Sequence, residues 1–171
     1  MPIVPYKSII KKTIDVVEDG LTFEENAQKK ANALPPMPDS WVLAEDSGIE
    51  VAHLDGAPGI YSARYAGEGA TKEDYCHKLL RECYGAGNRD AQFTAVMALR
   101  LPDQSIQLFR GEVHGTIAHE MCGDDGFGYD PVFIPEGYDQ TFGEMEPSLK
   151  HQLSHRYKAL MKVKAFIEDY L

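Results

Sequence analysis

The sequence predicts one α/β domain spanning residues 1–171, with a mixed sheet that contains a long β-hairpin and with helices that flank the sheet. Helix-like and strand-like patterns alternate along the chain, and two of the strand patterns are joined by one short turn. Neither a repeat nor a linker divides the sequence. With 43% hydrophobic residues, a chain of this length can bury one core.

The first long helix is expected to follow Thr22. Its hydroxyl can cap the helix while the Glu25 carboxylate reaches back, which is the capping-box arrangement. The helix should run through Lys30 and stop before Pro35-Pro36, because proline ends a helical pattern. Ahead of this helix, residues 3–6 have the pattern of a short strand.

Two further short strands are expected at residues 41–44 and 49–54, separated by the Glu45-Asp46-Ser47-Gly48 segment. Ala57-Pro58-Gly59 then turns the chain. A helix over residues 71–84 follows, with its larger apolar side chains on one face. These elements extend the alternation of strand and helix.

The hairpin is predicted from residues 92–101 and 106–113, with the turn at Pro102-Asp103-Gln104 between them. Residues 132–134 have the pattern of another short strand. The last helix should begin near Pro147, since proline suits the first turn of a helix.

Composition excludes several classes of protein. A net charge of −10 is unfavourable for binding DNA or RNA, although a small phosphorylated ligand remains possible where a local basic cluster and a divalent cation meet it. The sequence has no apolar run long enough for a membrane span and no signal-peptide pattern at its start. Three cysteines without CxxC spacing indicate neither a disulfide framework nor a zinc site, so a cytoplasmic protein is expected.

The segment Glu45-Asp46-Ser47-Gly48 is the first candidate for chemistry. It is expected where a buried strand reaches solvent, which is the place where α/β sheets bind ligands. Mg²⁺ prefers one or two carboxylates together with phosphate oxygens and water. Neighbouring residues of a strand point to opposite faces, so only one of the two carboxylates can face a given site. The alternative is a solvated acidic turn.

Three further segments are candidates. Gly126-Phe127-Gly128-Tyr129-Asp130-Pro131 combines flexible glycines with aromatic stacking faces, although the aromatics could equally pack inward. Lys150, Ser154, His155 and Arg156 on the last helix suit an anionic or carbonyl-bearing ligand, the alternative being a solvated basic face. Lys30, preceded by Glu18, by itself indicates only a charged helix surface.

Together and in this order, these segments resemble the inosine triphosphate pyrophosphatase family. The matching segments are Gly20-Leu21-Thr22-Phe23-Glu24-Glu25-Asn26-Ala27, Glu45-Asp46-Ser47-Gly48, Gly56 through Gly67, Gly126 through Phe133, and Ser154-His155-Arg156. The resemblance covers about residues 15–170. It implies Mg²⁺-dependent hydrolysis of non-standard purine nucleoside triphosphates, such as those of inosine and xanthosine, to the monophosphate and pyrophosphate. It also implies a homodimer.

The resemblance implies specific roles at the phosphate end of the substrate. Glu18 and Asp46 would hold Mg²⁺, and Asp46 would also orient or deprotonate the attacking water. Lys30 would contact phosphate, and Ser47 would touch the nucleotide beside Asp46. Electrostatics and positioning dominate such transfers, which suits these residue types.

At the base end, the resemblance implies that Phe127 stacks on the base while His155 and Arg156 read its 6-keto edge. The remaining implied contacts are Gly128, Tyr129, Asp130 and Lys150. Donors directed at a carbonyl oxygen would be left unpaired by adenine, and unpaired polar groups reject an analogue strongly.

The sequence departs from the family near its start. The phosphate-gripping pattern Ser/Thr-x-Asn-x-x-Lys is not found, and Ser8-Ile9-Ile10-Lys11 lacks its asparagine. Ile3-Val4-Pro5-Tyr6 instead resembles the second strand of the family, so the first strand and loop are expected to be missing. Two other hypotheses therefore stay open: a weakly active or inactive nucleotide-binding relative, and a hydrolase of other modified nucleotides, including pyrimidine ones.

Overall fold

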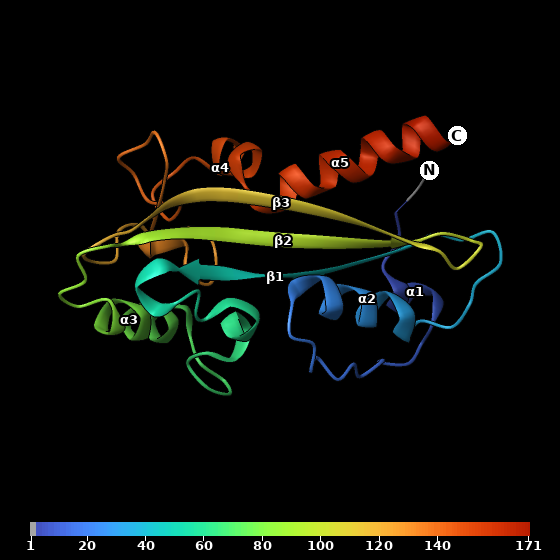
Figure 1. Cartoon of the computed structure of the whole chain (residues 1–171), viewed down its shortest axis with the longest axis horizontal. Coiled ribbons are helices and arrows are strands. Elements are labelled where there is room, and N and C mark those ends of the chain that lie inside the picture. The colour runs from blue at the N-terminus through green and yellow to red at the C-terminus, as the bar shows by residue number, and fades with distance from the viewer. Residues whose placement is uncertain (1–2) are drawn as a thin grey trace.

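The long β-hairpin is the centre of the structure, a computed structural model that describes residues 3–171 (Figure 1). Its strands are β2 (Asp90–Arg100) and β3 (Ile106–Ile117). β1 (Val42–Val51) pairs with β2, and β4 (Phe133–Pro135) pairs with the end of β3. The strand order is β1-β2-β3-β4, and every pair is antiparallel. The mixed α/β fold with its long hairpin is confirmed.

Two long helices cover opposite faces of the sheet (Figure 1). Successive side chains of a strand alternate between the faces, so β2 supplies both cores. Val96 and Ala98 pack against α2 (Phe23–Ala33), whereas Ala95 and Met97 belong to the core under α5 (His155–Tyr170). A third core, around Phe133 and Phe142, lies at the other end of the sheet.

The other helices complete the fold. They are α1 (Tyr6–Ile9), η1 (Ala52–Leu54), η2 (Gly59–Arg64), α3 (Lys72–Glu82), η3 (Asp130–Val132) and α4 (Pro147–Leu153). α3 contributes Cys76 and Leu79 to the third core. Cys76 and Cys83 are both buried. Among the helices of residues 3–171, none has the length and apolar character that a bilayer crossing requires.

Helix starts follow the predicted capping chemistry. The Thr22 hydroxyl accepts a hydrogen bond from the Glu25 amide at 3.1 Å, and α2 ends before Pro35 as expected. The Glu25 carboxylate accepts from the amide of Leu21 rather than from that of Thr22. Thr71 caps α3 with a full capping box.

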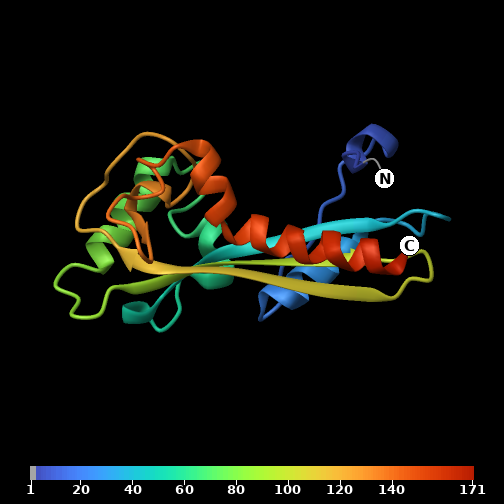
Figure 2. The same ribbon diagram turned by 90° about the horizontal axis from the view of Figure 1, so that it is seen from above.

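The prediction of a strand at residues 3–6 is wrong. Residues 3–5 are irregular, and a single helical turn, α1, begins at Tyr6. A strand needs a neighbour to bond its amides and carbonyls, and Figure 2 shows α1 standing away from the sheet. Pro5 precedes the turn and supplies no amide hydrogen to any ladder.

The two strands expected around residues 45–48 are one continuous strand, β1. Gly48 stays in the ladder opposite Thr94 instead of ending a strand. A Cβ at Gly48 would lie 2.3 Å from the Gly59 carbonyl oxygen and 2.5 Å from the Ser62 hydroxyl. The glycine therefore allows η2 to approach a strand that continues through it, and the acidic segment lies within β1 rather than at its end.

The prediction of one continuous last helix is also corrected. It is divided at Ser154, whose ψ of 149° is extended, into α4 and α5. The Ser154 hydroxyl accepts from the Tyr157 amide at 3.1 Å and so caps α5. Lys150 and Ser154 therefore do not share a face of one helix, because serine used as a cap interrupts the helical path.

Candidate active site

The alternation of side chains along β1 divides the predicted site residues between the two faces of the sheet. Asp46 lies opposite Val96 and faces α2, whereas Glu45 and Ser47 lie opposite Met97 and Ala95 and face α5. The predicted separation of the neighbouring carboxylates is therefore confirmed. The other predicted site residues form two separate groups, one on each face of the sheet.

On the α2 face, Lys30 joins the two carboxylates of the predicted metal pair. Its Nζ lies 2.7 Å from Asp46 Oδ1 and 3.0 Å from Glu18 Oε2. It also donates to the backbone oxygen of Glu45 at 3.2 Å. Lys30 thus points inward to the sheet, whereas its sequence context alone indicated a solvated helix surface. We call Lys30, Asp46 and Glu18 the carboxylate cluster.

Burial sets the electrostatics of this cluster. Asp46 is only 7% exposed, and burial raises its pKa above the ordinary value even though Lys30 acts in the opposite direction. Burial would lower the pKa of Lys30, but its bonds to Asp46 and Glu18 outweigh this and raise it. Lys30 is consequently a permanent cation, and Asp46 is a carboxylate with increased basicity, which suits a general base.

The carboxylate cluster fits a hard cation that arrives with a phosphorylated ligand. Within residues 3–171, no group of three or more His, Cys, Asp or Glu side chains is placed to hold a metal. Mg²⁺, however, commonly takes one or two carboxylates and completes its shell with phosphate oxygens and water. Glu18 and Asp46 supply these two ligands, and the buried Asp46 Oδ2 has no hydrogen-bond partner. The Lys30 ammonium is the positive charge between them in this structure.

On the α5 face, Arg156 is held by two residues of β1. Its Nε lies 2.7 Å from Glu45 Oε1, and its Nη2 donates to the Ser47 hydroxyl at 3.1 Å. The guanidinium carbon lies 4.8 Å from the centroid of the Phe127 ring. Bonds to a carboxylate and a hydroxyl fix the plane of the guanidinium, so Arg156 is oriented before any ligand binds.

Phe127 is the exposed aromatic of this face, with 56% of its surface accessible. Its loop is held by Asp130, which is buried and accepts hydrogen bonds from the Phe127 amide, at 2.8 Å, and from Lys150. The Lys150 ammonium lies 4.7 Å from the Phe127 ring centroid. A cation near an aromatic ring is favourable. We call Phe127, Arg156 and Lys150 the aromatic cluster.

Of three further residues that were predicted to contact the ligand, two have buried side chains and one is a glycine in the loop. Tyr129 is buried, and its hydroxyl donates to the Ser62 carbonyl oxygen at 2.7 Å. His155 is 6% exposed and stacks on Phe93, with ring centroids 4.9 Å apart. Gly128 has a φ of 58° and gives the loop its turn. Tyr129 and Gly128 therefore shape the loop, and Phe127 presents the aromatic face.

Two residues with clear roles were missed in the sequence. Glu45 orients Arg156, and Asn26 is wholly buried beside the carboxylate cluster. Asn26 precedes Lys30 by one helical turn, and this spacing was a usable signal, because residues i and i+4 share a helix face. For Glu45, no local pattern identifies a partner that lies more than a hundred positions away.

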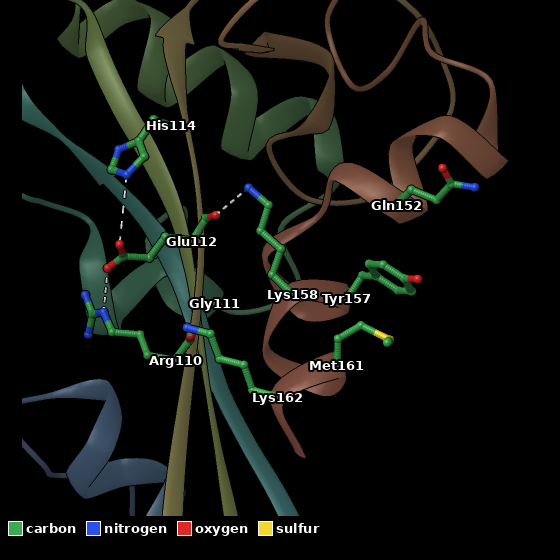
Figure 3. A pocket seen from close by; sticks show the side chains of 9 residues that line it. All are labelled: Arg110, Gly111, Glu112, His114, Gln152, Tyr157, Lys158, Met161 and Lys162. Atoms are coloured by element: carbon green, nitrogen blue, oxygen red, sulfur yellow. Dashed lines mark hydrogen bonds and ion pairs between the residues drawn. The ribbon is translucent and has the colours of Figure 1, made fainter. Parts of the chain in front are cut away.

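A cavity of about 570 Å³ lies between α5 and the unpaired edge of β3, away from both clusters (Figure 3). There Lys158 and Lys162 donate to the carbonyl oxygens of Glu112 and Arg110, at 2.9 and 2.6 Å. Lysines on a strand edge block pairing with other strands, so Lys158 and Lys162 protect the open edge of β3 from such pairing. None of the predicted site residues lines the cavity.

The two clusters lie on opposite faces of an edge strand of the sheet. β2 pairs with one side of β1, and the outer edge of β1 carries, among the described residues, one isolated bridge between Glu50 and Pro58. A ligand that passes over this open edge can touch both clusters. An elongated ligand with an anionic end and a planar end matches the arrangement.

Comparison with known proteins agrees with this arrangement. A model of the Ham1 family matches residues 2–166, which is nearly the whole chain. This chain belongs to the Ham1 family. The Ham1-family chain is 45% identical over 161 residues to the dITP/XTP pyrophosphatase of Clostridium tetani, covering 92% of this chain and 80% of that relative. The dITP/XTP pyrophosphatase of Desulfotalea psychrophila is 46% identical over 151 residues, covering 88% of this chain and 68% of that relative.

Solved structures of the Ham1 family confirm the fold. The Ham1 protein of Staphylococcus aureus superposes with a TM-score of 0.92 at 41% identity, covering 98% of this chain and 87% of that one. A HAM1 protein from Coxiella burnetii gives 0.85 at 36% identity, covering 91% and 81%. The resemblance to the inosine triphosphate pyrophosphatase family is therefore confirmed.

Proposed function

We propose that this chain is a Mg²⁺-dependent nucleoside triphosphate pyrophosphatase that acts on non-standard purine nucleotides, including those of inosine and xanthosine. The names of the relatives support the reaction class. The observation that carries the proposal is the pair of clusters on opposite faces of β1. One cluster suits a metal-bound phosphate chain and the other suits a planar base.

The carboxylate cluster supplies what hydrolysis at a phosphate requires. Glu18 and Asp46 would hold Mg²⁺, which when bound neutralises phosphate charge and polarises the phosphorus. Lys30 is in place to contact phosphate oxygens once its carboxylate partners bind the metal. Asp46, with its raised pKa, accepts a proton from a water that attacks the phosphorus. The bond between the α- and β-phosphates then breaks, releasing the nucleoside monophosphate and pyrophosphate.

The aromatic cluster supports recognition of the base. Phe127 offers an exposed face for stacking, and the guanidinium of Arg156 lies beside it with its orientation fixed by Glu45 and Ser47. A guanidinium donates hydrogen bonds and accepts none. It therefore favours a carbonyl at position 6 of a purine, and an adenine amino group would leave its donors unpaired.

Asp46→Asn tests the chemistry. We expect pyrophosphate release from inosine triphosphate to fall by about 10²- to 10⁴-fold, because the amide cannot accept the proton or bind Mg²⁺ as a carboxylate does. The measurement is an enzyme-coupled pyrophosphate assay at saturating Mg²⁺, with xanthosine, deoxyinosine and adenosine triphosphates compared in parallel.

Asp90→Asn serves as the matched control, since Asp90 lies at the far end of β2, opposite Thr116. It should leave the rate unchanged. Release of orthophosphate alone by the wild type, or a best substrate without a 6-keto purine, would overturn the proposed function.

We also propose that the protein acts in the cytoplasm as a homodimer. Its three cysteines are free, and burial raises the pKa of the Cys76 thiol to about 12, which is compatible with a reducing compartment. The resemblance to the inosine triphosphate pyrophosphatase family also implies a homodimer. Sedimentation of the purified chain with and without nucleotide would measure the oligomeric state.

A further inference from the structure

Asn26 has a buried amide whose nitrogen has no partner. The residue is fully inaccessible to solvent, and within the described chain its Nδ2 makes no hydrogen bond. Buried polar atoms in native proteins are nearly always satisfied, so an exception requires an explanation. Asp46 Oδ2, also buried, is an unpartnered acceptor of the same region.

These two unpartnered atoms belong to neighbouring groups. Asn26 lies one turn before Lys30 on α2, and Lys30 bonds Asp46. Burial raises the pKa of Asp46, and the Asn26 amide is among the groups that lower it, as expected for a donor near a carboxylate. The Asn26 amide therefore lies near Asp46, on the helix turn that precedes Lys30.

The other end of the amide is fixed. Asn26 Oδ1 accepts a hydrogen bond from the Gly20 amide at 2.9 Å. A Cβ at Gly20 would lie 2.5 Å from this oxygen, so the loop can approach only because the residue is glycine. With its oxygen held, the amide plane cannot rotate freely, and the nitrogen keeps its direction.

Gly20 lies two residues after Glu18, the other carboxylate that Lys30 bonds. One amide thus contacts the loop that carries Glu18 through its oxygen and neighbours Asp46 through its nitrogen. Glu18 and Asp46 come from separate segments of the chain. Their separation depends on what holds these segments. Lys30 bonds both carboxylates, and Asn26 bonds the Gly20 amide of the Glu18 segment from a position near Asp46.

We propose that Asn26 is a positioning residue that sets the separation and orientation of the Glu18 and Asp46 carboxylates. The inference rests on the proposed function, since it concerns the pair that would bind Mg²⁺. When a cation takes the place of Lys30 between the carboxylates, Asn26 remains as the neutral link. Such outer partners of metal ligands affect metal affinity or activity by about 10- to 100-fold.

Asn26→Ala tests the inference with Mn²⁺ as the probe, followed by electron paramagnetic resonance in the absence of nucleotide. We expect the dissociation constant for Mn²⁺ to rise about tenfold or more, and kcat for inosine triphosphate at saturating Mg²⁺ to fall about as much. Ala31→Gly is the matched control, because Ala31 is buried on the same helix and packs in the apolar core with Val96 and Ala98. It should lower the Tm while leaving Mn²⁺ affinity and kcat unchanged.

A second variant covers the case in which Asn26→Ala does not fold. Asn26→Asp keeps the shape of the side chain and the acceptor for Gly20, and replaces the donor that neighbours Asp46 by a negatively charged acceptor. We expect it to fold with kcat reduced at least tenfold. Wild-type kcat in this variant, or a lower Tm with unchanged Mn²⁺ affinity and kcat in Asn26→Ala, would overturn the inference.

The proposed function and the inference fail differently. A wild-type protein that binds Mn²⁺ but releases no pyrophosphate contradicts the function, while the Mn²⁺ affinity of Asn26→Ala still decides the role of Asn26. A wild-type protein that binds no Mn²⁺ contradicts the inference itself.

Discussion

Lys30 illustrates how single residues prepare the site. Two carboxylates at close range repel each other, and a third group must offset that repulsion in the absence of a metal. The Lys30 ammonium, 2.7 Å from Asp46 and 3.0 Å from Glu18, does so. Under the proposed function, a cation would replace Lys30 between the carboxylates, and Lys30 would then be available for phosphate.

His155 gives a prediction at the residue scale. Burial lowers the pKa of His155 from its ordinary value of 6.5 to about 3, with the positive charge of Arg156 acting in the same direction. The folded protein therefore holds His155 neutral, while the unfolded chain gains a proton below pH 6.5. This favours unfolding as the pH falls from 6.5 towards 3, by about 1.4 kcal/mol per pH unit.

The measurement is denaturant unfolding at pH 7 and pH 5. The wild type should lose about 2 kcal/mol more than His155→Phe, which keeps a ring against Phe93 but cannot bind the proton. Equal losses in the two proteins would show that His155 is protonated in the folded state.

Among the elements, the contact of α5 with β3 determines where Arg156 lies. Gly111 of β3 has no side chain, and a Cβ there would lie 2.1 Å from the His155 carbonyl oxygen and 2.4 Å from the Ala159 amide nitrogen. The first turn of α5 therefore rests directly on the strand. Ser154, which caps this turn, fixes where the helix begins.

Gly111→Ala tests this contact. The added methyl cannot fit without moving α5, and such overpacking costs about 1–3 kcal/mol in unfolding free energy. Displacement of α5 should also weaken nucleotide binding, because Arg156 is on its first turn. Gly87→Ala is the control, since its Cβ would meet nothing within 4 Å. Unfolding curves and KM are measured for both, and unchanged values for Gly111→Ala would contradict the close packing.

At the scale of the whole molecule, the single strand β1 lies between the carboxylate cluster and the aromatic cluster. Asp46 faces α2, and its neighbours Glu45 and Ser47 face α5. Under the proposed function, the two halves of the substrate would therefore be recognised independently, one by charge and metal and the other by stacking and directed hydrogen bonds.

This separation predicts different kinetic effects on the two faces. Phe127→Ala should raise KM for inosine triphosphate about tenfold or more with little change in kcat, because base stacking contributes about 1–3 kcal/mol. Glu18→Gln should instead raise the Mg²⁺ concentration required for half-maximal rate. Steady-state kinetics over a matrix of nucleotide and Mg²⁺ concentrations separates the two effects. If both variants change the same parameter, the faces do not act separately.

The sequence by itself determined where α2 and α3 begin, the hairpin and the segments that carry the family resemblance. Capping residues such as Thr22 and Thr71, and the turn before Ile106, act over a few positions, so local patterns report them well. The alternation of side chains along a strand also predicted that Glu45 and Asp46 point to opposite faces of the sheet.

Only the tertiary structure decided which partners each residue meets. The inward direction of Lys30, the bond from Arg156 to Glu45 and the place of Asn26 depend on helices packing on particular faces of β1. The continuous course of β1 through Gly48 depends on pairing with β2. These contacts join positions far apart in the chain, and their energy comes from burial and pairing that no local pattern contains.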